Sequence, residues 1–126
     1  MWEDEKLTRV LVVEDAPFLR YAFGRLLRLQ GFEVMEANDG LEALEKLDHF
    51  HAQLVLTDVM MPVMDGIELI RRLKTDPKTA NLPVVAITAD SSGNAEERAR
   101  EAGAVGFITK PIDFPALLNH LRGIHV

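Results

Sequence analysis

The chain has no cysteine among its 126 residues, which excludes a disulfide framework and thiolate metal sites and fits a reducing cytoplasm. No apolar run approaches the roughly 18 residues that a membrane-spanning helix needs. Basic residues are few, because 14 Lys and Arg stand against 20 Asp and Glu, for a net charge of -6. This acidic balance opposes binding to phosphate backbones. We therefore expect a cytoplasmic protein that binds neither nucleic acid nor a membrane.

What the chain does contain is a regular alternation of two kinds of segment. Its length fits one domain, which we expect over residues 9–126, with 1–8 as a frayed N-terminal extension. Short β-branched runs predict five strands, at Arg9–Val13, Glu33–Ala37, Gln53–Thr57, Pro83–Thr88 and Val105–Thr109.

Segments with helical spacing follow each of these runs. The first is predicted to begin at Pro17, to stop at Gly31 and to share one face among Leu19, Ala22, Phe23, Leu26 and Gln30. The second follows Asp39-Gly40, and the third follows Asp65-Gly66 and ends near Asp76-Pro77. The fourth is short and polar, at Asn94–Ala102, and the last carries an apolar stripe of Phe114, Leu117, Leu118 and Leu121. Five alternating strands and helices predict an α/β fold with a parallel sheet covered on both faces.

Polar residues collect where the predicted strands end. The first strand is followed by Glu14-Asp15, the third by Asp58, the fourth ends in Thr88 and the fifth is followed by Lys110. Ligands of an open parallel sheet bind outside the carboxyl ends of its strands, so these side chains should share one edge. Three close carboxylates repel one another unless a cation neutralises them. Their hard oxygen ligands suit Mg²⁺ better than zinc or copper.

Each of these residues also has a purely structural interpretation. Asp15 could cap the helix that begins at Pro17, and Asp58 could form an Asx-turn. Thr88 is a residue type that often ends strands, and a lone lysine such as Lys110 is usually solvated. Their joint occurrence at successive strand ends favours chemistry instead. A carboxylate beside Mg²⁺ and an ammonium group is arranged for phosphoryl transfer, which needs positioning and charge neutralisation.

Four sequence segments, taken together and in order, resemble the receiver domain of two-component response regulators. The resemblance extends from about Arg9 to Ile124, and its segments are Val12-Val13-Glu14-Asp15, Asp58-Val59-Met60-Met61-Pro62-Val63-Met64-Asp65-Gly66, Thr88-Ala89 and Phe107-Ile108-Thr109-Lys110-Pro111. It implies a flavodoxin-like three-layer sandwich whose five-stranded parallel sheet has the order 2-1-3-4-5, with five helices. It also implies a cis peptide bond between Lys110 and Pro111.

The resemblance further implies a phosphorylation-dependent signalling switch. Asp58 is then the phosphoacceptor, which receives its phosphoryl group from a sensor histidine kinase or a histidine phosphotransfer protein. Glu14, Asp15, Asp58 and the backbone carbonyl of Met60 are the implied environment of Mg²⁺, for which Mn²⁺ can substitute. Lys110 is the implied counter-charge. Such a domain is not an enzyme beyond its own phosphoryl transfer and dephosphorylation.

Thr88 and Phe107 correspond to the family's switch pair. The implied change moves the Thr88 hydroxyl toward the phosphoryl group and turns the Phe107 ring inward. The surface of the fourth helix, fifth strand and last helix would report this change to a downstream partner. Arg98, Arg100 and Glu101 are expected on or near that surface, although each also fits a solvated helix face.

Two positions depart from common patterns of the family. The residue two past Asp58 is Met60, whose side chain cannot hydrogen-bond an attacking water, and we expect slow intrinsic dephosphorylation. The residue two past Thr88 is Asp90, whose charge could order or repel that water. Phe107 keeps an aromatic ring at the switch without a hydroxyl group.

Three other classes of protein compete with this interpretation. A phosphatase that uses an aspartyl-phosphate needs a second acid where Met60 stands. A flavin-binding module needs a phosphate loop after the first strand, where Glu14-Asp15 would repel a phosphate. A pseudo-receiver would have no need of the complete acidic set. The sequence names no kinase, downstream partner or pathway, and it is compatible with a monomer or a weak dimer. The chain ends soon after its last predicted helix, which favours a stand-alone regulator over a fragment.

Overall fold

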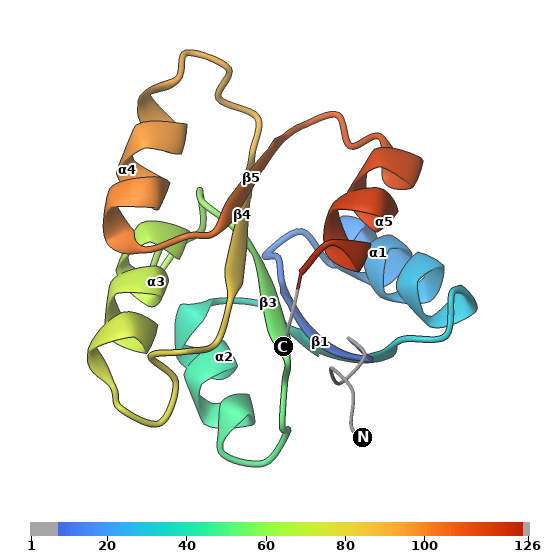
Figure 1. Cartoon of the computed structure of the whole chain (residues 1–126), viewed down its shortest axis with the longest axis horizontal. Coiled ribbons are helices and arrows are strands. Elements are labelled where there is room, and N and C mark those ends of the chain that lie inside the picture. Colours follow the sequence, from blue (N-terminus) through green and yellow to red (C-terminus); the bar gives the residue numbers. More distant parts are fainter. Residues whose placement is uncertain (1–7, 125–126) are drawn as a thin grey trace.

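The computed structural model describes residues 8–124 and shows a three-layer α/β sandwich (Figure 1). All four strand pairs are parallel, and the strand order is β2-β1-β3-β4-β5. The strands are β1 (Arg9–Val13), β2 (Glu33–Ala37), β3 (Leu54–Asp58), β4 (Val84–Thr88) and β5 (Gly106–Thr109). The helices are α1 (Pro17–Leu29), α2 (Gly40–Leu47), α3 (Gly66–Thr75), α4 (Asn94–Ala102) and α5 (Phe114–Arg122). The predicted flavodoxin-like fold and strand order are confirmed.

The sheet separates two hydrophobic cores. Successive strand residues point to opposite faces, so Val10 and Val12 pack with α1 and α5, whereas Leu11 and Val13 pack with α2, α3 and α4. Figure 1 shows this division of the helices between the two faces. The last four of the five β1 residues have 2% or less of their surface exposed. A strand buried on both sides needs a continuous apolar run rather than an alternating one, which β1 has.

The starts of α2, α3 and α5 are each capped by a side chain that accepts a hydrogen bond from the first turn. Asp39, Asp65 and Asp113 each accept from the backbone N–H three residues later, at the starts of α2, α3 and α5. Such a cap satisfies one of the N–H groups that a helix start leaves unpaired. Two of these caps belong to the Asp-Gly pairs from which the sequence predicted helix starts.

The face predicted for α1 is partly wrong. Leu26 has 42% of its surface exposed and Gln30 is exposed beyond the helix, whereas Leu27 is completely buried. The buried stripe therefore runs through Phe23 and Leu27, four residues apart, with Leu19 partly buried beside them. Apolar residues surround much of α1, so spacing alone did not decide which stripe faces the sheet. The predicted stripe of α5 is confirmed, since Leu117, Leu118 and Leu121 are buried and Phe114 packs against them.

Predicted and observed strand bounds agree to within one residue. The difference that matters most is at β3, which was predicted to end at Thr57. In the structure Asp58 is its last residue and pairs with Ile87 of β4. The predicted frayed extension falls mostly on residues 1–7, outside the described residues. Thr8 donates from its backbone N and its hydroxyl to Oε1 of Gln53 at 2.7 and 2.9 Å. Within residues 8–124, no helix is long and apolar enough to cross a membrane.

Candidate phosphoacceptor and metal site

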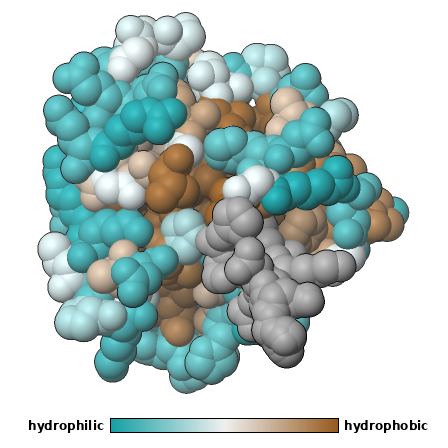
Figure 2. Space-filling model, in the orientation of Figure 1, coloured by the Kyte–Doolittle hydropathy of each residue, from teal (hydrophilic) through white to brown (hydrophobic). Residues whose placement is uncertain are grey.

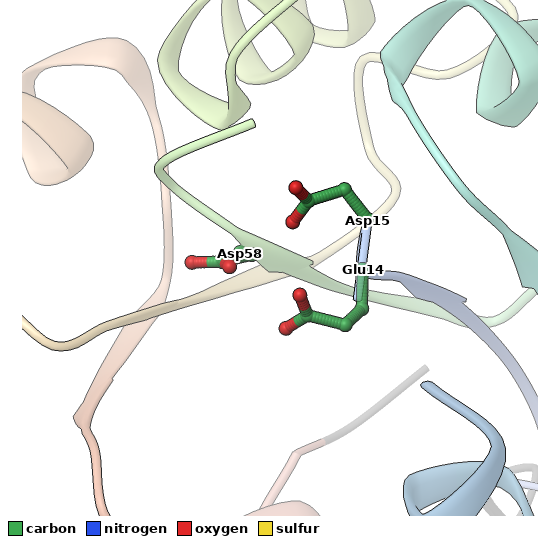
Figure 3. A group of neighbouring side chains, drawn as sticks. All are labelled: Glu14, Asp15 and Asp58. Atoms are coloured by element: carbon green, nitrogen blue, oxygen red, sulfur yellow. The ribbon is translucent and has the colours of Figure 1, made fainter. Parts of the chain in front are cut away.

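Three carboxylates converge at the carboxyl ends of β1 and β3. Glu14 and Asp15 leave the end of β1, Asp58 ends β3, and all three carboxylates point to the same side (Figure 3). One oxygen from each lies within 4.8 Å of the others, an arrangement that could hold a metal ion. Asp15 is exposed, whereas Glu14 and Asp58 have only 3% and 6% of their surface exposed. The sheet topology therefore brings together the three acids that the sequence predicted.

Lys110 joins this group from the end of β5. Its Nζ donates to Oε1 of Glu14 and to Oδ2 of Asp58, both at 3.2 Å. These two ion pairs link residues 96 and 52 positions apart in the chain. The two carboxylates raise the pKa of Lys110 above its ordinary value, against an opposing effect of burial that is the largest single contribution. Lys110 thus stays protonated and holds the two buried carboxylates together.

Glu14 is the most constrained of the acids. Its Oε2 accepts the backbone N–H of Ala16 at 3.1 Å, and its Oε1 accepts Lys110. Burial raises the pKa of Glu14, the Ala16 bond lowers it, and the charge of Asp58 raises it further. The net direction is upward. Burial is the main cause of this direction, and the nearby charge of Asp58 adds to it while Lys110 opposes it.

The loop after Asp58 is tightly built. Gly66 at the start of α3 donates its N–H to the carbonyl of Val59 at 2.9 Å, and a Cβ at Gly66 would lie 2.2 Å from the carbonyl oxygen of Asp58. Only glycine allows this approach. Val63 has a φ of 70° and 75% of its surface exposed, so a β-branched residue occupies the left-handed region here. Met60 has 69% of its surface exposed, and its backbone N–H donates to Oδ1 of Asp58 at 3.4 Å.

The predicted switch residues lie on β4, which pairs with β3, and on the edge strand β5 beyond it. Thr88 ends β4 with none of its surface exposed, and its hydroxyl oxygen accepts the backbone N–H of Asp90 at 3.2 Å. Phe107 on β5 is half-buried and packs against the core beneath α3 and α4. The Lys110–Pro111 peptide bond is cis, as the resemblance implied.

One contact to the site was missing from the sequence predictions. Arg20 of α1 donates from Nη1 to the backbone carbonyl of Glu14 at 2.8 Å. The sequence held a signal, because Arg20, Gly24 and Arg28 recur every four residues and so share one helix face. That spacing alone did not reveal what the face contacts.

Comparison with known proteins shows the family to which the chain belongs. The response regulator receiver domain family matches residues 10–122. The chain belongs to this family. Receiver domains are signalling domains of two-component systems and not enzymes in the ordinary sense.

Curated relatives contain this domain in two settings. The sensor protein EvgS of Escherichia coli K12 is 38% identical over 121 residues, which cover 96% of this chain but only 10% of that protein. The polar-differentiation response regulator DivK of Brucella ovis is 34% identical over 113 residues, covering 90% of this chain and 92% of that one. The chain therefore spans a small part of one relative and nearly the whole of another.

Solved structures support the fold independently. The chemotaxis protein CheY4 of Vibrio cholerae is 30% identical, with a TM-score of 0.85 over 91% of this chain and 96% of that one. The receiver domain of sensor histidine kinase PA1611 from Pseudomonas aeruginosa has a magnesium ion coordinated in its active site cleft. It is 26% identical, with a TM-score of 0.83 over 90% of this chain and 93% of that one.

Proposed function

We propose that Asp58 accepts a phosphoryl group from a phosphohistidine of a histidine kinase or histidine phosphotransfer protein. The observation that carries the proposal is the contact of Lys110 with both Asp58 and Glu14 at the ligand-binding edge of the sheet. In the transfer, a carboxylate oxygen of Asp58 attacks phosphorus and forms a P–O bond as the P–N bond breaks. The bonding electrons leave with the imidazole nitrogen, which takes up a proton. Lys110 neutralises charge on the phosphoryl oxygens.

We propose that the reaction depends on Mg²⁺, for which Mn²⁺ can substitute. The carboxylates of Glu14, Asp15 and Asp58 and the backbone carbonyl of Met60 would hold the ion. Support comes from their hard oxygen donors and from the carboxylate oxygens of Glu14, Asp15 and Asp58, which lie within 4.8 Å of one another. The bound ion would supply two positive charges to neutralise the phosphoryl oxygens.

We further propose that phosphorylation changes the surface formed by α4, β5 and α5, through Thr88 and Phe107. β5 and α5 are closely packed, because a Cβ at Gly106 would lie 2.3 Å from Nε2 of His120. A groove of about 570 Å³ opens beside this contact, lined by Pro83, Val105, Asn119, His120, Gly123 and Ile124. Figure 2 shows hydrophobic surface near the middle of this view, between hydrophilic residues of α4 and α5. Such a mixed surface suits a regulated contact with a protein partner.

The same proposal places the chain in the cytoplasm, as a single receiver domain over residues 9–126 that is a monomer or a weak dimer. On α4, Arg98, Arg100 and Glu101 are exposed and available to a downstream partner.

The decisive experiment supplies acetyl phosphate with Mg²⁺ and measures intact mass. We expect the mass of one added phosphoryl group, no addition in Asp58→Asn, and full addition in Asp76→Asn. Asp76 is a matched control because it is an exposed aspartate at the end of α3, away from the site. A beryllofluoride titration followed by NMR should shift amide signals on α4, β5 and α5. An unmodified native protein, or labelling that persists in Asp58→Asn, would refute Asp58 as the phosphoacceptor.

A further inference from the structure

Arg20 links helix α1 to both the end of β1 and the neighbouring strand β2. Its Nη1 donates to the Glu14 carbonyl at 2.8 Å, and its Nε lies 3.5 Å from Oε1 of Glu36 on β2. Only 20% of the Arg20 side chain is exposed. The planar guanidinium group holds both partners at once, which a lysine ammonium on a flexible stem does less well.

The sequence around Arg20 is arranged to admit this contact. Gly24, one turn later, has no side chain, and a Cβ there would lie 2.7 Å from Oε2 of Glu36. Glycine inside a helix costs about 1 kcal/mol relative to alanine. Here its absence of a side chain leaves room for Glu36 to reach over the helix and contact Arg20 and Arg28.

The Glu14 carbonyl belongs to the peptide group that joins Glu14 to Asp15. Rotation of this peptide changes the direction in which Asp15 projects its carboxylate. The Glu14 side chain is already fixed by Ala16 and Lys110, but those bonds do not hold the carbonyl. Asp15 is exposed, at the start of the loop that leads into α1. The hydrogen bond from the largely buried Arg20 to the Glu14–Asp15 peptide therefore restricts the orientation of Asp15.

We propose that Arg20 is a positioning residue for the metal-binding carboxylates, acting through the Glu14–Asp15 peptide. This inference rests on the proposed function, since it concerns how well the acidic site holds Mg²⁺. The inference also predicts that loss of Arg20 changes the affinity for Mg²⁺ in the direction opposite to that expected from its charge alone. Removing a positive charge beside a cation site strengthens cation binding if charge alone matters. Loss of a positioning contact weakens cation binding instead.

Arg28 provides a closely matched control within the same helix. Its Nη1 lies 3.1 Å from Oε2 of Glu36, and its Nη2 donates to a backbone carbonyl, that of Val34, at 2.9 Å. Arg28 thus makes one ion pair with the same carboxylate and one bond to a carbonyl, as Arg20 does. The two residues differ in exposure, with 20% of the Arg20 side chain and 45% of the Arg28 side chain exposed, and in which carbonyl they hold. Only the carbonyl held by Arg20 belongs to the acidic site.

The experiment measures the dissociation constant of Mg²⁺ for unphosphorylated protein, by NMR titration of amide shifts, with Mn²⁺ paramagnetic broadening as a second readout. We expect Arg20→Ala to raise the constant about tenfold, at the lower end of the effect of removing outer contacts of metal ligands. Arg28→Ala should stay within about twofold of native protein, and the charge-conserving Arg20→Lys should weaken binding too. Thermal unfolding checks that each variant is folded. If Arg20→Ala does not fold, Arg20→Lys takes its place in the affinity measurement.

Each outcome separates the inference from the function on which it rests. Native affinity or tighter binding in Arg20→Ala would overturn the positioning role, and so would equal weakening by Arg20→Ala and Arg28→Ala. A native protein that binds Mg²⁺ and is phosphorylated on Asp58 upholds the proposed function in either case. A native protein that binds no Mg²⁺ would overturn the proposed metal site itself, and with it the role of Arg20.

Discussion

Replacing Val63 with glycine should stabilise the protein, although it removes a side chain. Val63 lies in the loop between Asp58 and α3 with a φ of 70°, in the left-handed region where a β-branched side chain collides with its own backbone. Strained backbone of this kind costs about 2 kcal/mol. Glycine adopts the same φ without that cost.

Two smaller effects oppose the gain. Glycine increases the conformational entropy of the unfolded chain, which costs about 0.7 kcal/mol. Val63 has 75% of its surface exposed, so truncation sacrifices only about 0.5 kcal/mol of hydrophobic burial. The expected net change is a gain of about 1 kcal/mol in the free energy of unfolding, or about 4 °C in Tm for a domain of this size.

Urea unfolding followed by far-UV circular dichroism measures this change. Val105→Gly is the control, because Val105 is also an exposed valine, at 53%, but lacks a positive φ. The free energy of unfolding of Val105→Gly should fall by about 1 kcal/mol, because of the added backbone entropy of the unfolded chain and the lost side-chain contacts. If Val63→Gly is destabilised as much as Val105→Gly, the strain assigned to Val63 is absent and the reasoning is refuted.

Three further predictions concern the same edge of the sheet. Met60→Asn should shorten the lifetime of phosphorylated Asp58, because an amide can orient water and a thioether cannot; unchanged or faster loss of label from the native protein would contradict this. Gly66→Ala should cost at least about 3 kcal/mol, because its Cβ would overlap the Asp58 carbonyl, whereas Gly123→Ala, with its nearest neighbour 3.6 Å away, should change little in the same urea assay. Lys110→Gln should lower the free energy of unfolding by about 2 kcal/mol at neutral pH, because it leaves two buried carboxylates without a counter-charge. This is less than the loss for a fully buried pair, because 23% of the Lys110 side chain is exposed. That loss should shrink in acid or with added Mg²⁺, and a loss independent of both would contradict the electrostatic explanation.

The sequence pattern was sufficient to predict the parallel direction of the strands and the residues at their ends. In a parallel sheet every strand runs the same way, so Glu14, Asp58, Thr88 and Lys110 reach one edge whatever the details of packing. Strand bounds were accurate because glycine, proline and charged residues interrupt each apolar run. The strand order itself came from the family resemblance and not from the periodicity.

What the sequence did not predict depends on contacts between distant segments. Leu26 and Leu27 are chemically identical neighbours, and only the packing of α1 on the sheet decides which is buried. The contact of Arg20 with Glu36 requires β2 to lie beside β1 and requires the space left by Gly24. The positive φ of Val63 runs against its residue type, so a reading of local preference would assign the opposite conformation.

The single hydrogen bond of the Thr88 side chain has a consequence for the speed of signalling. Within residues 8–124, the Thr88 hydroxyl oxygen accepts a hydrogen bond from the backbone N–H of Asp90, and the hydroxyl donates none. A hydroxyl group can accept and donate at the same time. Thr88 can therefore donate to a phosphoryl oxygen while it keeps the bond that anchors the β4–α4 loop. Rotation of the hydroxyl hydrogen about the Cβ–Oγ bond moves no heavy atom of the fully buried side chain, so in the proposed phosphorylated state it would precede any rearrangement of the loop.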